Sequence, residues 1–117
     1  MLIIKKQQLE QINDIKFRDF VLSCKKLIKD EHPEVYATRP DGEWETFILS
    51  KIKMANNYGI YDSKNVFMYI LTVAENPNYF HPRMPQWAIE ILTWPERNED
   101  DKIVQICKEV YKRNQLS

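Results

Sequence analysis

The sequence has 117 residues, the size of one ordinary domain, and its 17 Lys and Arg residues balance its 17 Asp and Glu residues. A net charge of zero gives no overall attraction to nucleic acid or anionic membranes, and no run approaches the roughly 18 apolar residues of a membrane span. Only two glycines are present, which leaves few tight hairpin turns and disfavours an all-β fold. We therefore expect one domain over residues 1–117, with no nucleic acid and no membrane among its partners.

The beginning of the chain and the two cysteines indicate the compartment. An apolar run at residues 2–4 precedes a lysine pair at 5–6, the reverse order of a signal peptide, so we expect a cytoplasmic protein. Cys24 and Cys107 each fall in an apolar helical stripe, which favours two buried thiols. A disulfide between them remains open if the first and last helices touch. No CxxC spacing occurs, so the cysteines do not indicate a zinc site.

Apolar residues at three- and four-residue steps predict a long first helix from residue 5 to about residue 30. A break or kink between Ile12 and Phe17 fits the less regular spacing there. The helix should end at His32, because the residue before a proline avoids the α region. The residues that follow, up to about Thr38, fit a single helical turn that starts with a proline.

Four further helices are expected. Asp41 is predicted to cap the second helix, Gly59 to end it in the left-handed conformation, and Asn98 to cap the last. Residues 78–84 form an aromatic, proline-bearing loop between the third helix and the fourth. The predicted boundaries are Asp41 to about Tyr58, Asp62-Ser63 to Asn76-Pro77, Pro85 to Trp94-Pro95, and Asn98 to the end. The sequence thus predicts an all-α single domain, an orthogonal or irregular bundle of about five helices.

No motif of an enzyme or cofactor site is present. His32 and His81 each precede a proline and have no HExxH or His-x-His partner, and no serine lies in a GxSxG elbow. With two glycines, no phosphate-cradling loop can form. Scattered residues could still assemble an active site, with His81 and the acidic cluster as the first positions to mutate. The absences nevertheless favour a non-enzymatic protein with no catalytic residue, no cofactor and no metal.

The densest acidic cluster consists of Glu96, Glu99, Asp100 and Asp101. Carboxylates in the first turn of a helix stabilise its N-terminus, so support of the last helix is the simplest interpretation. As a solvated edge, the cluster could also dock a basic partner. A paired-acid active site is the third alternative.

Aromatic residues gather around the two middle loops and favour protein binding. Tyr and Trp are common interface anchors, because they bury much area at little entropy cost. Tyr58 and Trp87 are more simply interpreted as core residues, whereas joint exposure of the loop residues would create an apolar patch that implies a partner. The candidate partner-binding residues are Tyr79, Phe80, His81, Arg83, Trp94, Glu96, Glu99 and Asp100.

Two segments, Tyr58-Gly59-Ile60 and Pro85-Gln86-Trp87-Ala88, lie between a long first helix and a final helix. This order resembles a family of small bacterial proteins that are often encoded in type VI secretion clusters, near spike and effector genes. The resemblance covers nearly the whole chain. The chain departs from that family before the Trp-Ala segment, where an Asp-rich loop is common and residues 76–82 are here aromatic and proline-bearing.

The two shared segments end and open helices, so the resemblance transfers no catalytic residue. It implies a cytoplasmic accessory protein that binds a secreted effector or a spike component, as an adaptor or co-chaperone for loading. An immunity protein that neutralises a co-encoded toxin is the alternative. An enzyme or toxin with an unrecognised site is the third hypothesis.

Overall fold

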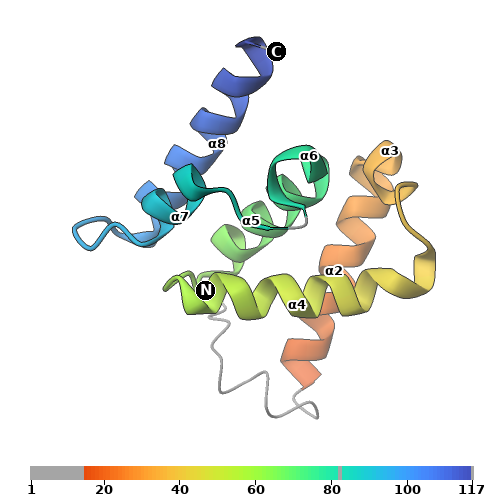
Figure 1. Ribbon diagram of the computed structural model, residues 1–117. Coiled ribbons are helices and arrows are strands. Elements are labelled where there is room, and N and C mark those ends of the chain that lie inside the picture. Colours follow the sequence, from red (N-terminus) through yellow and green to blue (C-terminus); the bar gives the residue numbers. More distant parts are fainter. Residues whose placement is uncertain (1–14, 82, 117) are drawn as a thin grey trace.

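The computed structural model describes residues 15–81 and 83–116. Over these residues it has no β-strand, and its seven α-helices confirm the predicted all-α fold (Figure 1). Five of them have seven or more residues, which agrees with the predicted number. The elements are α2 (Ile15–Glu31), α3 (Pro33–Tyr36), the 3-10 turn Asp41–Glu43, α4 (Trp44–Asn57), α5 (Ser63–Glu75), α6 (Pro77–Phe80), α7 (Gln86–Leu92) and α8 (Glu99–Leu116).

The centre of the core is built on α4 and α5, whose apolar residues recur at helical spacing. Six residues of these two helices are completely buried: Trp44, Ile48, Ile52, Ala55, Val66 and Ile70. Helix α2 packs against α4 and α5, while α8 packs against α5 and α7. In Figure 1, α4 runs across α2 rather than parallel to it, which agrees with an orthogonal or irregular bundle.

The turn after α4 forms as predicted. Gly59 has a φ of +79°, in the left-handed region that favours glycine. Its backbone nitrogen donates to the Asn56 carbonyl at 3.0 Å, and the Ile60 nitrogen donates to the Ala55 carbonyl at 2.9 Å. These are the two hydrogen bonds of a Schellman motif. Ile60 is buried, and the chain continues from it to the start of α5.

Two predicted helix starts are stabilised by side-chain caps. Asp62 Oδ1 accepts a hydrogen bond from the Lys64 backbone nitrogen at 2.9 Å, at the start of α5. Asn98 Oδ1 accepts one from the Asp101 nitrogen at 2.9 Å, at the start of α8. Each carboxylate or amide oxygen satisfies a backbone donor that the helix itself leaves unpaired.

Asp41 does not cap α4, so that prediction is wrong. Asp41 begins the 3-10 turn that precedes the helix, and no side chain caps α4 itself. The Asp41 carboxylate instead accepts a hydrogen bond from the Tyr36 hydroxyl and lies 3.4 Å from Lys25 Nζ. Asp41 therefore ties α2 and α3 to this turn, because its carboxylate contacts Lys25 of α2 and Tyr36 of α3.

The predicted loop of residues 78–84 is partly helical. Pro77 opens the four-residue helix α6, where its fixed φ suits the first helical position. The Phe80 nitrogen donates to the Asn76 carbonyl at 3.3 Å, and the Phe80 ring is buried. The other proline-initiated turn, α3, lies where the sequence favours one.

The remaining expectations concern the cysteines, the kink and the membrane. Cys24 is buried and Cys107 is half-buried, and both thiols are free rather than joined in a disulfide. The kink expected between Ile12 and Phe17 falls mostly outside the described residues. Among the helices that the structure describes, none combines the length and apolar character needed to cross a membrane.

Candidate functional site

A surface groove of about 540 Å³ lies between α7, the turn that follows it, and α8. Its volume falls within the usual range for a site that accepts a small ligand or a few side chains of a partner. The lining residues are Trp87, Glu90, Ile91, Thr93, Trp94, Pro95, Gln105 and Glu109.

Helix α7 places one wall of the groove because its two faces differ. Pro85 precedes the helix in an extended conformation, and its carbonyl accepts hydrogen bonds from the Ala88 and Ile89 nitrogens, both at 3.1 Å. Ala88 and Leu92 are completely buried and anchor α7 to the core. The face of α7 that carries Trp87 therefore lies at the edge of the core and lines the groove toward α8.

Trp87 forms a rigid part of the groove. Its ring centre lies 6.2 Å from that of Tyr79 and 5.9 Å from that of Phe80. The Arg113 guanidinium lies 4.5 Å from the Trp87 ring centre, and Arg113 Nε donates to Glu109 Oε1 at 3.1 Å. Trp87 is half-buried rather than a full core residue, because one part of its ring packs on the core and another faces the groove.

Trp94 stands at the rim, with 41% of its surface exposed. The Arg97 guanidinium lies 4.3 Å from its ring centre, and Arg97 Nη1 lies 3.9 Å from Asp101 Oδ2. Arg97 thus holds the indole from one side, while the rest of the ring remains accessible. A large, restrained, exposed indole is the kind of side chain that anchors protein interfaces.

Negative charge borders the apolar part of the groove. Glu90 lines it directly, and Glu96 is exposed just beyond Pro95. Neither carboxylate forms an ion pair with any of the described residues. The groove therefore offers apolar contact together with carboxylates that are free to meet a positive charge.

The structure divides the predicted partner-binding residues between the two ends of α8. Tyr79 lies near the C-terminal end, where its hydroxyl donates to Asn114 Oδ1 at 2.9 Å. Glu99 and Asp100 open the helix at its other end, about 20 Å away by helical rise. Of the remaining predicted residues, His81, Arg83, Trp94 and Glu96 are exposed, and Phe80 is buried. They do not form one continuous patch, and only Trp94 lines the groove.

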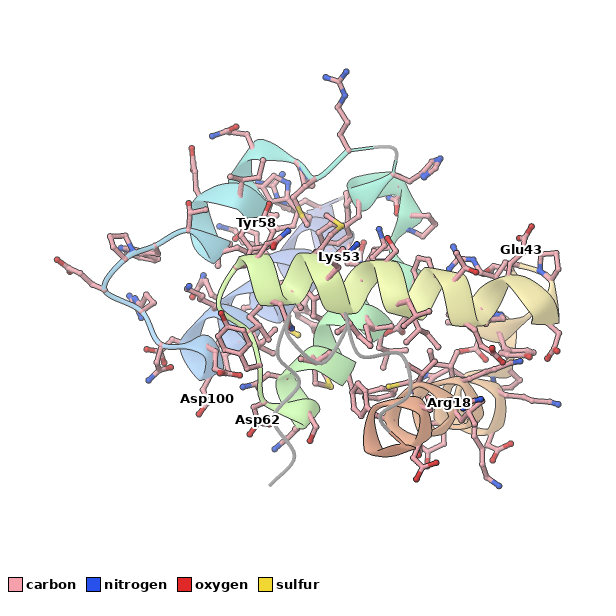
Figure 2. All side chains as sticks on the ribbon, turned by 90° about the horizontal axis from the view of Figure 1, so that it is seen from below. Arg18, Glu43, Lys53, Tyr58, Asp62 and Asp100 are labelled. Carbon is pink, nitrogen blue, oxygen red and sulfur yellow. The ribbon has the colours of Figure 1, made fainter. Side chains whose placement is uncertain are left out.

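The acidic cluster does not form one solvated edge. Glu99 is half-buried, and its Oε1 accepts hydrogen bonds at 2.9 Å from the Asp62 nitrogen and from Asn65 Nδ2. Asn65 Nδ2 also donates to Asp100 Oδ1 at 2.6 Å. Figure 2 shows Asp62 and Asp100 close together where α5 and α8 begin. The first residues of α8 therefore secure the start of α5, a long-range role that their sequence position does not reveal.

Several groove residues escape the sequence prediction. The sequence predicts Trp87 in the core, and Glu90, Gln105 and Glu109 belong to no sequence motif. The spacing of Trp87, Ile91 and Trp94 does place three large residues on one side of α7 and its extension. That signal could have found half of the groove, whereas the α8 half depends on how two helices pack.

The capacity to bind a metal and the state of the Cys24 thiol are two features of the described residues that are relevant to catalysis. No cluster of at least three His, Cys, Asp or Glu side chains there could hold a metal ion. Burial raises the pKa of the Cys24 thiol to about 12, so this thiol stays protonated at neutral pH. Comparison with protein families, curated proteins and solved structures finds no match.

Proposed function

We propose that this chain is a non-enzymatic, cytoplasmic accessory protein of a type VI secretion system that binds an effector or spike component through the groove between α7 and α8. It would act as an adaptor or co-chaperone for loading. The groove with its exposed Trp94 is the observation that supports protein binding. The secretion context is supported by the sequence resemblance alone.

The chemistry of the groove defines the segment that would occupy it. Trp87, Ile91 and Pro95 offer apolar surface, which suits a large aliphatic or aromatic side chain. Glu90 and Glu96 suit a Lys or Arg next to that side chain, because both carboxylates lack an ion-pair partner among the described residues. The proposed ligand is therefore a partner segment with an apolar anchor and an adjacent basic residue.

The two indoles are held before any partner arrives. Arg113 stacks on Trp87 and Arg97 on Trp94, and each arginine also pairs with a carboxylate of α8. Side chains that are already restrained lose less conformational entropy on binding. This arrangement favours a binding surface over an accidental exposure of two tryptophans.

Affinity capture from the native host, followed by mass spectrometry, tests the proposal. Wild-type protein should recover an effector or spike component, which is then measured with purified protein. Trp94→Ala and Glu90→Arg should each weaken that complex by about tenfold or more, as expected for an interface anchor and a charge reversal. Leu22→Ala is the matched control, because Leu22 is 53% exposed on α2 and does not line the groove.

Equal binding by wild type and both groove variants would refute the groove as the binding site. Recovery of no secretion component would count against the secretion context. Co-expression with a co-encoded toxin separates the adaptor from the alternative, an immunity protein. An adaptor should fail to restore growth, and an immunity protein should restore it.

A further inference from the structure

A second feature joins the segment before α4 to that helix itself, which contributes no residue to the groove. Arg39 and Lys51 both lie against the Phe47 ring, with Arg39 Cζ 3.7 Å and Lys51 Nζ 5.4 Å from its centre. Arg39 Cζ is also 4.7 Å from the Trp44 ring centre. Two cations therefore share one aromatic ring, and attraction to the ring has to offset their mutual repulsion.

Arg39 differs from the other arginines that stack on rings in the described part of the chain. Arg97, over Trp94, has the Asp101 carboxylate at 3.9 Å, and Arg113, over Trp87, has the Glu109 carboxylate at 3.1 Å. Arg39 has no carboxylate within ion-pair distance among the described residues.

The N–H donors of Arg39 and Lys51 are also poorly satisfied by hydrogen-bond acceptors. Arg39 Nη1 is buried and has no hydrogen-bond partner among the described residues. Among the residues that the structure describes, Lys51 Nζ donates only to Met54 Sδ, a weak acceptor, at 3.7 Å. Burial, and secondly the charge of Arg39, hold the pKa of Lys51 below its usual value. Partly desolvated donors without acceptors are costly, and an anion would reduce that cost.

Nearby acids do not supply this anion. Asp41 and Glu45 both lie 3.4 Å from Lys25 Nζ, on the side of α4 that faces α2. Glu43 stabilises the charged form of Arg39 through space, although it does not approach to ion-pair distance. The Arg39–Lys51 pair thus keeps an excess of positive charge.

We propose that Arg39 and Lys51 together bind a phosphate group. A guanidinium offers a planar fork of N–H donors to phosphate oxygens, and an ammonium adds a mobile point charge. Two cations also match the charge of a phosphate dianion. Figure 2 marks the start of α4 with Glu43 and its end with Tyr58, and Figure 1 places α3 and α7 on opposite sides of the molecule. The phosphate site is therefore separate from the α7–α8 groove.

Thermal unfolding with inorganic phosphate as the probe tests the phosphate site. At tenfold excess over its Kd, phosphate should raise Tm by about 3–6 °C relative to sodium chloride of equal ionic strength. Arg39→Gln and Lys51→Gln should each abolish most of this difference. Two matched controls should keep the phosphate-dependent rise in Tm. Arg97→Gln replaces another ring-stacked arginine, and Lys53→Gln replaces an exposed lysine on α4.

The phosphate-dependent shift is compared within each variant, so a change in basal stability does not affect the result. If Arg39→Gln fails to fold, the phosphate site is still tested by Lys51→Gln and by the phosphate-dependent chemical shifts of wild-type α4 amides. An equal response to acetate, or an equal response of all variants, would overturn the proposal. Vesicles of phosphatidylcholine with and without phosphatidic acid identify the source of the phosphate. Binding that requires Arg39 and phosphatidic acid assigns it to a lipid headgroup, and a response to inorganic phosphate alone assigns it to a soluble molecule.

Discussion

Glu99 Oε1 accepts a 2.9 Å hydrogen bond from the backbone nitrogen of Asp62, 37 residues earlier in the chain. Glu99 lies in the first turn of α8, and Asp62 is the N-cap of α5. Glu99 Oε1 accepts a second hydrogen bond, from Asn65 Nδ2 at 2.9 Å, which joins the same carboxylate to α5 itself. One side chain therefore fixes where the last long helix begins relative to the central one.

Replacement of Glu99 by alanine should destabilise the fold. The Asp62 nitrogen and the Asn65 amide would lose a charged acceptor, so we expect the free energy of unfolding to fall by about 1.5–3 kcal/mol. Urea denaturation monitored by circular dichroism measures this change. Glu96→Ala is the control, because Glu96 is exposed in the same acidic cluster and has no ion pair among the described residues; it should change stability by less than about 0.5 kcal/mol. Equal effects of the two variants would contradict the assigned role of Glu99.

Gly59→Ala should also be destabilising, for a reason confined to the backbone. A Cβ at this position meets only Lys102 Nζ at 3.9 Å, so steric overlap with neighbours is not the cause. The φ of +79° costs an L-residue about 1–2 kcal/mol. Gly42→Ala is the matched control, because nothing lies within 4 Å of its added Cβ and its φ is not positive. The free energies of unfolding of Gly59→Ala and Gly42→Ala should differ by at least about 1 kcal/mol. Equal values would show that the Gly59 turn tolerates a side chain.

The three tryptophans should differ in their contribution to stability. Trp44 is completely buried and its Nε1 donates to the Tyr36 carbonyl at 3.0 Å, so Trp44→Ala should cost about 3–5 kcal/mol. Trp94→Ala should cost less than about 1 kcal/mol, because its ring is exposed at the groove rim. Trp87→Ala should fall between them. Chemical denaturation gives the order, and a large loss for Trp94→Ala would mean that the variant cannot report on binding alone.

The two cysteines should differ in reactivity toward an alkylating reagent. Cys24 is buried and its pKa is raised to about 12, so it has neither access nor thiolate at pH 8. Half-buried Cys107 should be modified first. Mass spectrometry of iodoacetamide-treated native protein, with Cys107→Ser and Cys24→Ser as controls, identifies the site. Modification of Cys24 at the same rate would contradict its burial.

Cys24 should also make stability depend on alkaline pH. The unfolded thiol ionises near its ordinary pKa of 9.0, whereas burial delays ionisation of the folded one to about 12. The contribution of the protonated Cys24 thiol to the free energy of unfolding is therefore complete below pH 9 and is lost as the pH rises toward 12. In this window wild type should lose up to about 1.4 kcal/mol per pH unit more than Cys24→Ala. Urea denaturation of both proteins at two pH values above 9 tests this, and parallel losses would refute it.

Local chemistry made much of the fold predictable. Gly59 and Asn98 carry out the roles that their residue types suggest, because a left-handed turn and a helix cap depend on a few neighbouring residues. Asp41 shows the limit of such reasoning. It has the right side chain to cap α4, but Tyr36 and Lys25, brought close by the packing of α2 and α3, bind its carboxylate instead.

The candidate sites were less predictable than the helices. The sequence identified Trp94 but grouped it with Tyr79 and Phe80, which lie toward the other end of α8 and of which Phe80 is buried. It gave no signal for the Arg39–Lys51 pair, because Arg39 reaches the Phe47 ring from the segment before the 3-10 turn. A surface is assembled from separate segments, so its members share no spacing that a sequence pattern could reveal.

By itself, the sequence determined an all-α domain, its main helices and most of their ends, since helical periodicity, prolines, glycines and caps act over a few residues. Only the tertiary structure decided which surfaces exist. It made Glu99 a support of α5, opened a groove between Trp87 and Trp94, and left Arg39 and Lys51 against the Phe47 ring with no acid at ion-pair distance among the described residues. The physical reason is that burial and charge pairing depend on distances between helices, which packing sets and local propensity does not.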